Sequence, residues 1–117
     1  MGSPIFLMLK PLPMKTPKFL FEISQVDSGR FKLKGELSFV SVQAAMKKAA
    51  EFFDFPTGKM VFDLAGITKA DSAGLALLLE WLRLAGLSGV DLHYVNLPRQ
   101  LLAMAHVAGV DEILIID

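Results

Sequence analysis

Residues 62–75 read FDLAGITKADSAGL, and this stretch decides how the whole chain is organised. It begins inside a short apolar run, Met60 to Leu64, that is rich in strand formers, as is typical of a central strand covered on both faces. Asp71 and Ser72 then precede an apolar segment that continues to Gly86–Gly89, which predicts a long helix. We therefore expect a strand, a loop and a helix in close succession.

The segments before this stretch predict an antiparallel hairpin followed by a helix. Apolar and polar residues alternate in 19–24 and again in 31–36, and turn-forming residues at 27–29 separate the two runs. Residues 41–53 change to a helical period. The chain should thus open with two paired strands and cross over through a helix.

The segments after it continue the alternation of strand and helix. Residues 91–95 predict a strand, residues 98–108 a helix with proline in its first turn and Gly109 past its end, and residues 112–116 a last strand. This order predicts an α/β fold with a mostly parallel sheet, the N-terminal hairpin at one edge and about three helices.

Composition limits the classes of function. The 117 residues are 53% hydrophobic, twelve basic residues balance twelve acidic ones, and there is no cysteine. The balance of charge disfavours nucleic-acid binding, and the apolar start is too short to cross a bilayer. We expect one domain over residues 17–117 and a flexible extension over residues 1–16, in which Met14 could equally be the natural start.

The turn at Asp71 and Ser72 is the first candidate for a functional site. We expect Asp63 to close the central strand, and loops at the carboxyl ends of parallel strands are where α/β proteins meet ligands and partners. Asp71 or Ser72 can also cap the helix, a structural role that needs no function. Gly74 in the first turn favours a place where another backbone approaches closely.

These residues resemble STAS domains, the fold shared by anti-sigma factor antagonists and the cytoplasmic tails of sulfate transporters. The resemblance covers the chain from about Phe19 onward and depends on Asp63-Leu64 and on Asp71-Ser72-x-Gly74-Leu75. It implies a STAS domain that acts by binding a protein partner and does not catalyse a reaction.

Within that family, residues 71–79, DSAGLALLL, are most similar to MlaB-type subunits of phospholipid-transporting Mla ABC complexes. That resemblance implies a non-catalytic cytoplasmic subunit, associated with an inner-membrane transporter that maintains outer-membrane lipid asymmetry. Its partner would be the ATPase subunit, with the Ser72 hydroxyl in or near the contact.

Anti-sigma factor antagonists that bind an anti-sigma kinase are the alternative. In that group the regulatory phosphoacceptor is the serine immediately before the glycine, where this chain has Ala73. Ser72 is then the possible phosphoacceptor, although Asp71 beside it would oppose a phosphate.

The predicted second helix is apolar nearly all round. Leu75, Leu78 and Ala85 lie on one stripe that can face the sheet, whereas Leu77, Trp81 and others follow another side. We expect that second side to be exposed in the isolated chain and to bind the ATPase or a second copy, with Trp81 as anchor. The alternative is that Trp81 packs under a neighbouring helix or the N-terminal tail.

The remaining predictions follow from absences in the sequence. His93 and His106 show no ligand spacing, and there is no phosphate-binding glycine loop or nucleophile elbow, so we expect no metal, no cofactor and no catalysis. A receiver-like phosphoacceptor domain would open with a strand carrying paired acidic residues, which this chain lacks. The expected partner-binding residues are Thr68, Asp71, Ser72, Ala73, Gly74, Leu77, Trp81 and Leu84.

Overall fold

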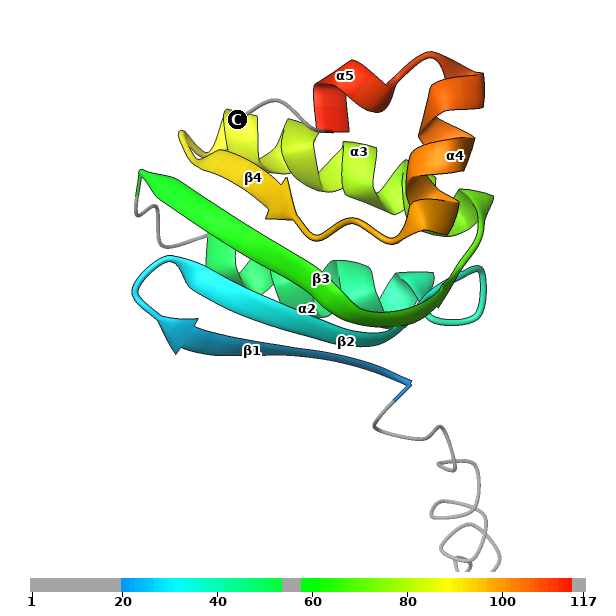
Figure 1. Cartoon of the computed structure of the whole chain (residues 1–117). Coiled ribbons are helices and arrows are strands. Elements are labelled where there is room, and N and C mark those ends of the chain that lie inside the picture. Colours follow the sequence, from blue (N-terminus) through cyan, green and yellow to red (C-terminus); the bar gives the residue numbers. More distant parts are fainter. Residues whose placement is uncertain (1–19, 54–57, 115–117) are drawn as a thin grey trace, which may run out of the picture.

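The computed structural model describes residues 20–53 and 58–114. Its elements follow in the order β1 (Phe21–Asp27), β2 (Arg30–Leu37), α2 (Val42–Phe53), β3 (Lys59–Ala70), α3 (Ser72–Leu87), β4 (Asp91–Val95), α4 (Arg99–Ala108) and α5 (Asp111–Leu114). The four strands form one sheet in the order β1-β2-β3-β4 (Figure 1). β1 pairs with β2 antiparallel, and the other two pairs are parallel, which confirms the predicted α/β fold and its N-terminal hairpin.

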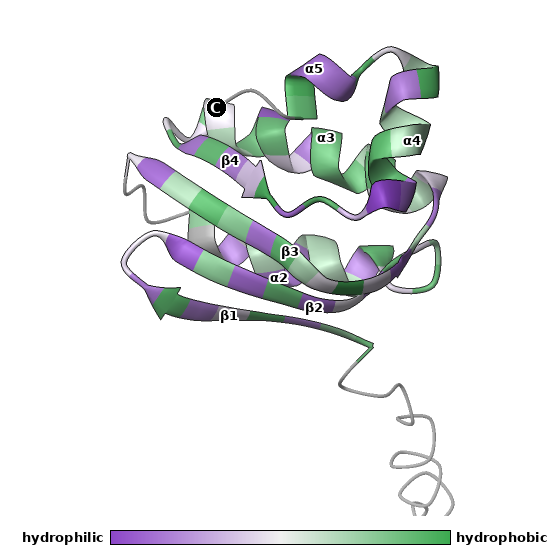
Figure 2. Ribbon diagram, viewed as in Figure 1, coloured by the Kyte–Doolittle hydropathy of each residue, from purple (hydrophilic) through white to green (hydrophobic). Residues whose placement is uncertain are grey.

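The two faces of the sheet have opposite character. Along β2, Phe31 and Leu33 are buried, whereas Lys32 and Lys34 between them are exposed. This alternation along the first two strands is visible in Figure 2. α2 and α3 pack on the apolar face, and α4 packs against α3, so one helical layer covers one side of the sheet.

The centre of the core is aromatic. Trp81 of α3 lies edge-on to Phe62 of β3, with ring centroids 5.5 Å apart, and it also contacts Phe21 of β1. The hydroxyl of Tyr94 in β4 donates a 2.6 Å hydrogen bond to the carbonyl oxygen of Leu78 in α3. These contacts fix α3 across the middle of the sheet.

Two predictions about the strands are wrong. The central strand does not close at Asp63, because β3 continues to Ala70 and pairs with β2 up to that residue, with two register shifts. Residues 111–114 form the short helix α5 rather than the start of a last strand. The end of that predicted strand, residues 115–116, and the predicted extension, residues 1–16, lie outside the described residues.

Candidate functional site

Parallel pairing places two connecting loops at the same edge of the sheet. Leu37, the last residue of β2, pairs with Ala70, the last residue of β3. The β2–α2 loop, residues 38–41, therefore lies beside the Asp71–Ser72 turn that opens α3 (Figure 1). The carboxyl edge of the sheet thus gathers both loops, as α/β folds with a functional edge do.

Asp71 joins these two loops through its carboxylate. It is the N-cap of α3, and its Oδ1 accepts from the amides of Ala73 (2.9 Å) and Gly74 (3.2 Å). Its Oδ2 accepts from the amide of Phe39 in the neighbouring loop (3.0 Å). The Phe39 bond is the largest of the causes that hold the pKa of Asp71 below its ordinary value, followed by the two cap bonds and Lys69.

Ser72 is available at the surface. It is exposed on the first turn of α3, and its hydroxyl makes no hydrogen bond to any residue that the structure describes. Thr68 is also exposed, but its hydroxyl donates to the carbonyl oxygen of Gly35 (3.2 Å). Ala73 is half-buried. Of the predicted contact residues, Ser72 has the most freedom to bind a partner.

Gly74 serves the fold. It is buried, and a Cβ added there would lie 2.1 Å from the carbonyl oxygen of Leu37. The close approach that its position in the first turn predicted is therefore to β2 of the same chain. A glycine here lets α3 begin directly against the end of β2.

The expectation that one side of α3 is exposed is wrong. Trp81 is 0% exposed and Leu77 is 2% exposed, and both belong to the core, while Leu84 is half-buried against it. Trp81 packs on the aromatic side chains of Phe21 and Phe62 in the sheet. The N-terminal tail of the alternative prediction lies outside the described residues. In the isolated chain, Leu77 and Trp81 offer no surface to an ATPase or to a second copy.

The exposed apolar residues at this edge lie instead in the β2–α2 loop. Phe39 is 80% exposed and Val40 is 73% exposed, directly beside Asp71. Sequence reasoning missed them, although their position supplies a signal. They are two large apolar residues between a strand and a helix, flanked by Ser38 and Ser41, in a loop that parallel pairing brings next to the Asp71 turn.

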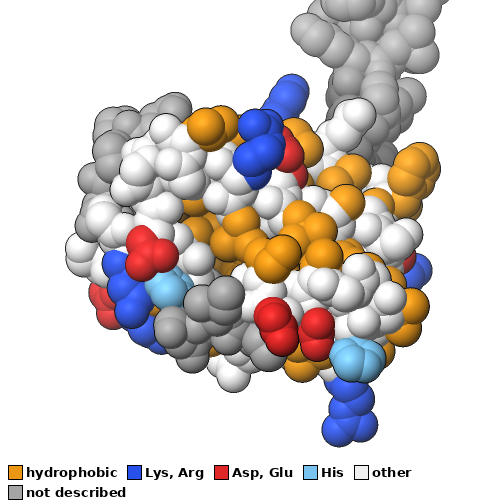
Figure 3. All heavy atoms as spheres, turned by 90° about the horizontal axis from the view of Figure 1, so that it is seen from above, with side chains coloured by type: hydrophobic (Ala, Val, Ile, Leu, Met, Phe, Trp, Pro, Cys, Tyr) orange, Lys and Arg blue, Asp and Glu red, His pale blue; other side chains and the backbone are white. Residues whose placement is uncertain are grey.

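An apolar groove continues this surface across the helices. It has a volume of about 420 Å³, lies between the start of α3 and α4, and is lined by Ser72, Leu75, Ala103, Met104, Val107 and Ala108. Val107 is 88% exposed at its rim. Figure 3 shows hydrophobic side chains gathered on the face formed by these helices. We call the exposed loop tip, Ser72 and this groove together the edge surface.

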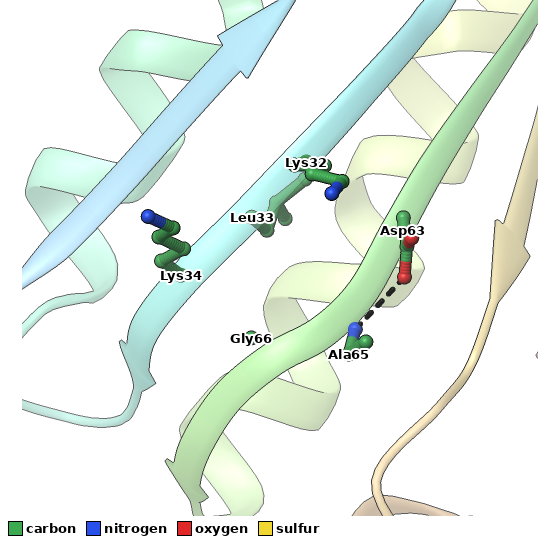
Figure 4. Close-up of a pocket in the computed structure, with 6 residues that line it drawn as sticks. All are labelled: Lys32, Leu33, Lys34, Asp63, Ala65 and Gly66. Carbon is green, nitrogen blue, oxygen red and sulfur yellow. Dashed lines mark hydrogen bonds between the residues drawn. The ribbon is translucent and has the colours of Figure 1, made fainter. Parts of the chain in front are cut away.

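A second hollow lies on the polar face of the sheet and is less suited to binding. It measures about 250 Å³, and a register shift between β2 and β3 beside Asp63 produces it. Asp63 accepts from the amide of Ala65 and the side chain of Asn96, and Asn96 is the largest cause of its lowered pKa. Figure 4 shows the Lys34 ammonium pointing away from Asp63, whereas Lys32 lies on the side of Asp63 and helps to lower the pKa of that carboxyl.

Asp63 is also remote from the Asp71 turn. Asp71 follows Asp63 by eight positions, which is roughly 25 Å at the usual rise of a strand. Among residues 20–53 and 58–114, no three potential metal-ligating side chains come together. None of the helices in the same part of the chain has the length and apolar character needed to cross a bilayer.

The fold and this edge together define the class of protein. A four-stranded sheet with one antiparallel hairpin, one helical layer and a capped turn at its carboxyl edge is the architecture of a STAS regulatory domain. A family profile described as "Mlab, STAS domain" matches residues 22–116. The chain belongs to the MlaB-type STAS domain family.

Solved structures share the fold. The anti-sigma factor antagonist SpoIIAA in its unphosphorylated form is 15% identical, with a TM-score of 0.64 over 81% of this chain and 85% of that one. The murine Slc26a9 anion transporter in the inward-facing state is 19% identical, with a TM-score of 0.60 over 76% of this chain and 15% of that one. A comparison with curated proteins found no significant match.

Proposed function

We propose that this chain is a non-catalytic STAS subunit that binds and regulates the ATPase subunit of a Mla-like ABC transporter for phospholipids. The observation that carries the proposal is the edge surface. It combines the exposed hydroxyl of Ser72, which bonds none of the described residues, with an apolar groove and an apolar loop tip, all at one end of the sheet. Membership of the MlaB-type family supports the choice of partner.

The chemistry of this surface favours a protein partner. The groove is lined almost entirely by apolar side chains, and Val107 at its rim is exposed to water in the isolated chain. An apolar hollow beside one free hydroxyl suits a ridge of apolar side chains flanked by a polar group, as a helix of another subunit presents. Asp71 already uses both carboxylate oxygens within the fold, which leaves the turn poorly equipped for acid–base catalysis.

Co-purification with the ATPase subunit of the cognate transporter tests the proposal. The wild-type chain should form a stable complex, and Val107→Glu should abolish it by placing a charge at the groove. Leu87→Glu is the matched control, because Leu87 is 73% exposed at the far end of α3 and outside the groove. Equal binding by both variants, or no complex with the wild-type chain, would rule the proposal out.

An anti-sigma kinase is the second candidate partner, and one observation favours it. Ser72 is exposed on the first turn of α3 with its hydroxyl free of bonds to described residues, so a kinase could reach it. Mass spectrometry after incubation with the cognate kinase distinguishes the two proposals. Phosphate on Ser72 would favour the kinase, and its absence together with ATPase binding would favour the transporter.

A further inference from the structure

We infer that Asp71 is a positioning residue that orients the loop tip of Phe39 and Val40 for insertion into an apolar socket on the ATPase subunit. This inference rests on the proposed function and adds to it a second contact element, on a different loop from Ser72. It also assigns separate tasks to the two oxygens of one carboxylate.

The two oxygens of Asp71 act on different parts of the chain. Oδ1 accepts the amides of Ala73 and Gly74 and so caps α3. Oδ2 accepts the amide of Phe39, which lies 32 residues earlier in the sequence. Capping alone needs one oxygen, so the second bond links the position of the loop directly to the start of the helix.

Hydrogen bonds of Ser38 and Ser41 hold the rest of the loop. Ser41 is buried, its Oγ accepts the amide of Ser38 (3.0 Å), and it donates to the carbonyl oxygen of Glu36 (2.7 Å). The amide of Val40 donates to Oγ of Ser38 (3.3 Å). The backbone of the loop is thus fixed on both sides of its tip.

The backbone of the tip is held by hydrogen bonds, whereas its side chains are exposed to water. Phe39 and Val40 are 80% and 73% exposed, although both amides are hydrogen-bonded. A loop whose backbone is already ordered loses less conformational entropy when its side chains enter a partner. Such an apolar tip is prepared for binding before the partner arrives.

The size of the tip indicates that its partner also contacts the residues around it. A buried aromatic side chain supplies about 150–250 Å², whereas a stable interface buries about 800 Å² on each side. The tip alone is therefore too small to hold any protein partner, which must cover neighbouring residues as well. It lies next to Ser72 and the groove, so the partner that covers those residues also covers Phe39.

The charges beside the tip argue against a lipid surface. Membrane-anchoring segments carry basic residues around their apolar side chains. Here Lys69 lies near Asp71, and Glu36 and Asp71 carry the opposite charge. Among these described residues, positive charge is not in excess, as it would be beside a loop that an anionic bilayer attracts.

Asp71→Asn separates the two tasks of the carboxylate. Asparagine caps helices as well as aspartate, but its amide nitrogen cannot accept the Phe39 amide. We expect only a small fall in melting temperature, because the helix cap is kept and one hydrogen bond is lost, and faster hydrogen exchange at the Phe39 amide, measured by NMR on the full chain. Asp63→Asn is the matched control and should leave that exchange unchanged, because Asp63 bonds Ala65 and Asn96 instead.

A binding cycle tests whether this clamp serves docking. With the purified ATPase subunit as the probe, Phe39→Ala should weaken binding about tenfold, as expected for a central aromatic anchor. Asp71→Asn should weaken it about fivefold, and should cause no further loss when Phe39 is already alanine, because both changes act through one element.

Three outcomes decide the matter. Loss of binding in both variants without additivity supports the inference. Wild-type affinity in Phe39→Ala, or fully additive losses, would overturn it while the proposed function stands. If the wild-type chain does not bind the ATPase subunit, the proposed function fails and the docking role fails with it, whereas the exchange experiment still decides whether the clamp exists.

Discussion

Two groups of large apolar side chains differ in their exposure to water. One group lies in the core and the other lies at the surface. Leu77 and Trp81 on α3 are 2% and 0% exposed and lie between the helix and the sheet. Phe39 and Val40 on the β2–α2 loop are 80% and 73% exposed, on a backbone held by Asp71 and Ser38. The comparison shows that an apolar side chain can belong to the core or to a contact surface. Only the fold determines which of the two it is.

The difference has a consequence for energetics. Side chains of the first group contribute to the stability of the fold, because folding removes them from water. Side chains of the second group contribute almost nothing to stability, and can contribute to binding when a partner covers them. Substitutions should therefore separate the two groups cleanly, and the following predictions either sharpen this division or break it.

The largest effect is expected at Trp81. Trp81→Ala removes contacts with Phe21 and Phe62 and leaves a cavity, so it should lower the free energy of unfolding by about 3–5 kcal/mol. Phe39→Ala should change it by less than about 0.5 kcal/mol, because that side chain is exposed. Urea denaturation of both variants measures the difference.

Trp81→Phe refines the same comparison. The indole Nε1 finds no hydrogen-bond acceptor among the described residues, so phenylalanine removes a buried, unsatisfied donor along with part of the ring. We expect it to cost clearly less than alanine. Similar losses for Phe39→Ala and Trp81→Ala would contradict the division between core and contact residues.

The next largest effect is expected at Gly74, which lets the start of α3 lie close to β2. Gly74→Ala places a methyl group against the carbonyl oxygen of Leu37 and should destabilise the fold by about 3 kcal/mol. Gly86→Ala, in the same helix with nothing within 4 Å of the added carbon, should stabilise it by about 0.5–1 kcal/mol. A Gly74→Ala variant as stable as the wild type would show that α3 can move away from β2.

Tyr94 gives a smaller effect with a clear pH dependence. Tyr94→Phe removes the bond to the Leu78 carbonyl oxygen and should cost about 0.5–1.5 kcal/mol. Burial raises the pKa of Tyr94 well above its ordinary value. A raised pKa in the folded state means that stability is fully present below the ordinary pKa and falls as the pH rises above it.

The chain offers a direct measurement of this prediction. Tyr94 is its one tyrosine, so the ultraviolet spectrum of the phenolate reports this residue alone. We expect phenolate to appear together with unfolding at alkaline pH, and the loss of stability at high pH to be smaller in Tyr94→Phe. Ionisation of Tyr94 in the folded chain at its ordinary pKa would contradict the buried hydrogen bond.

Much of the fold could be predicted because local patterns and packing agree. The alternation in the hairpin, the helix boundaries near Asp71 and Gly109, and the strand at residues 91–95 all match the structure. The end of β3 was harder to predict, because the glycine, threonine and lysine within residues 66–69 are typical of a loop. Pairing with β2 supplies hydrogen bonds that sequence periodicity does not reveal, and this extends the strand to Ala70.

The position of the Asp71 turn could be predicted, but not which side chains around it are exposed. The motif at Asp71 and Ser72 lies at the carboxyl edge of the sheet as predicted, and the cap bonds of Asp71 follow from residue type, whereas the role of this edge as a contact site stays a prediction. The exposed side of α3 could not be predicted, because a helix apolar nearly all round gives no direction to its buried face. The clamp on Phe39 joins residues 32 positions apart, which only the pairing of β2 with β3 brings together.

The smallest effect on stability, at Ser72, gives the sharpest test of function. The hydroxyl is exposed and bonds no described residue, so Ser72→Ala should change the free energy of unfolding by less than about 0.5 kcal/mol. If the partner donates to or accepts from this hydroxyl, the same variant should recover less ATPase subunit in co-purification, because a buried polar group of the partner is left unpaired. A variant that folds and binds as the wild type would remove Ser72 from the contact and leave the groove and the loop tip to account for docking.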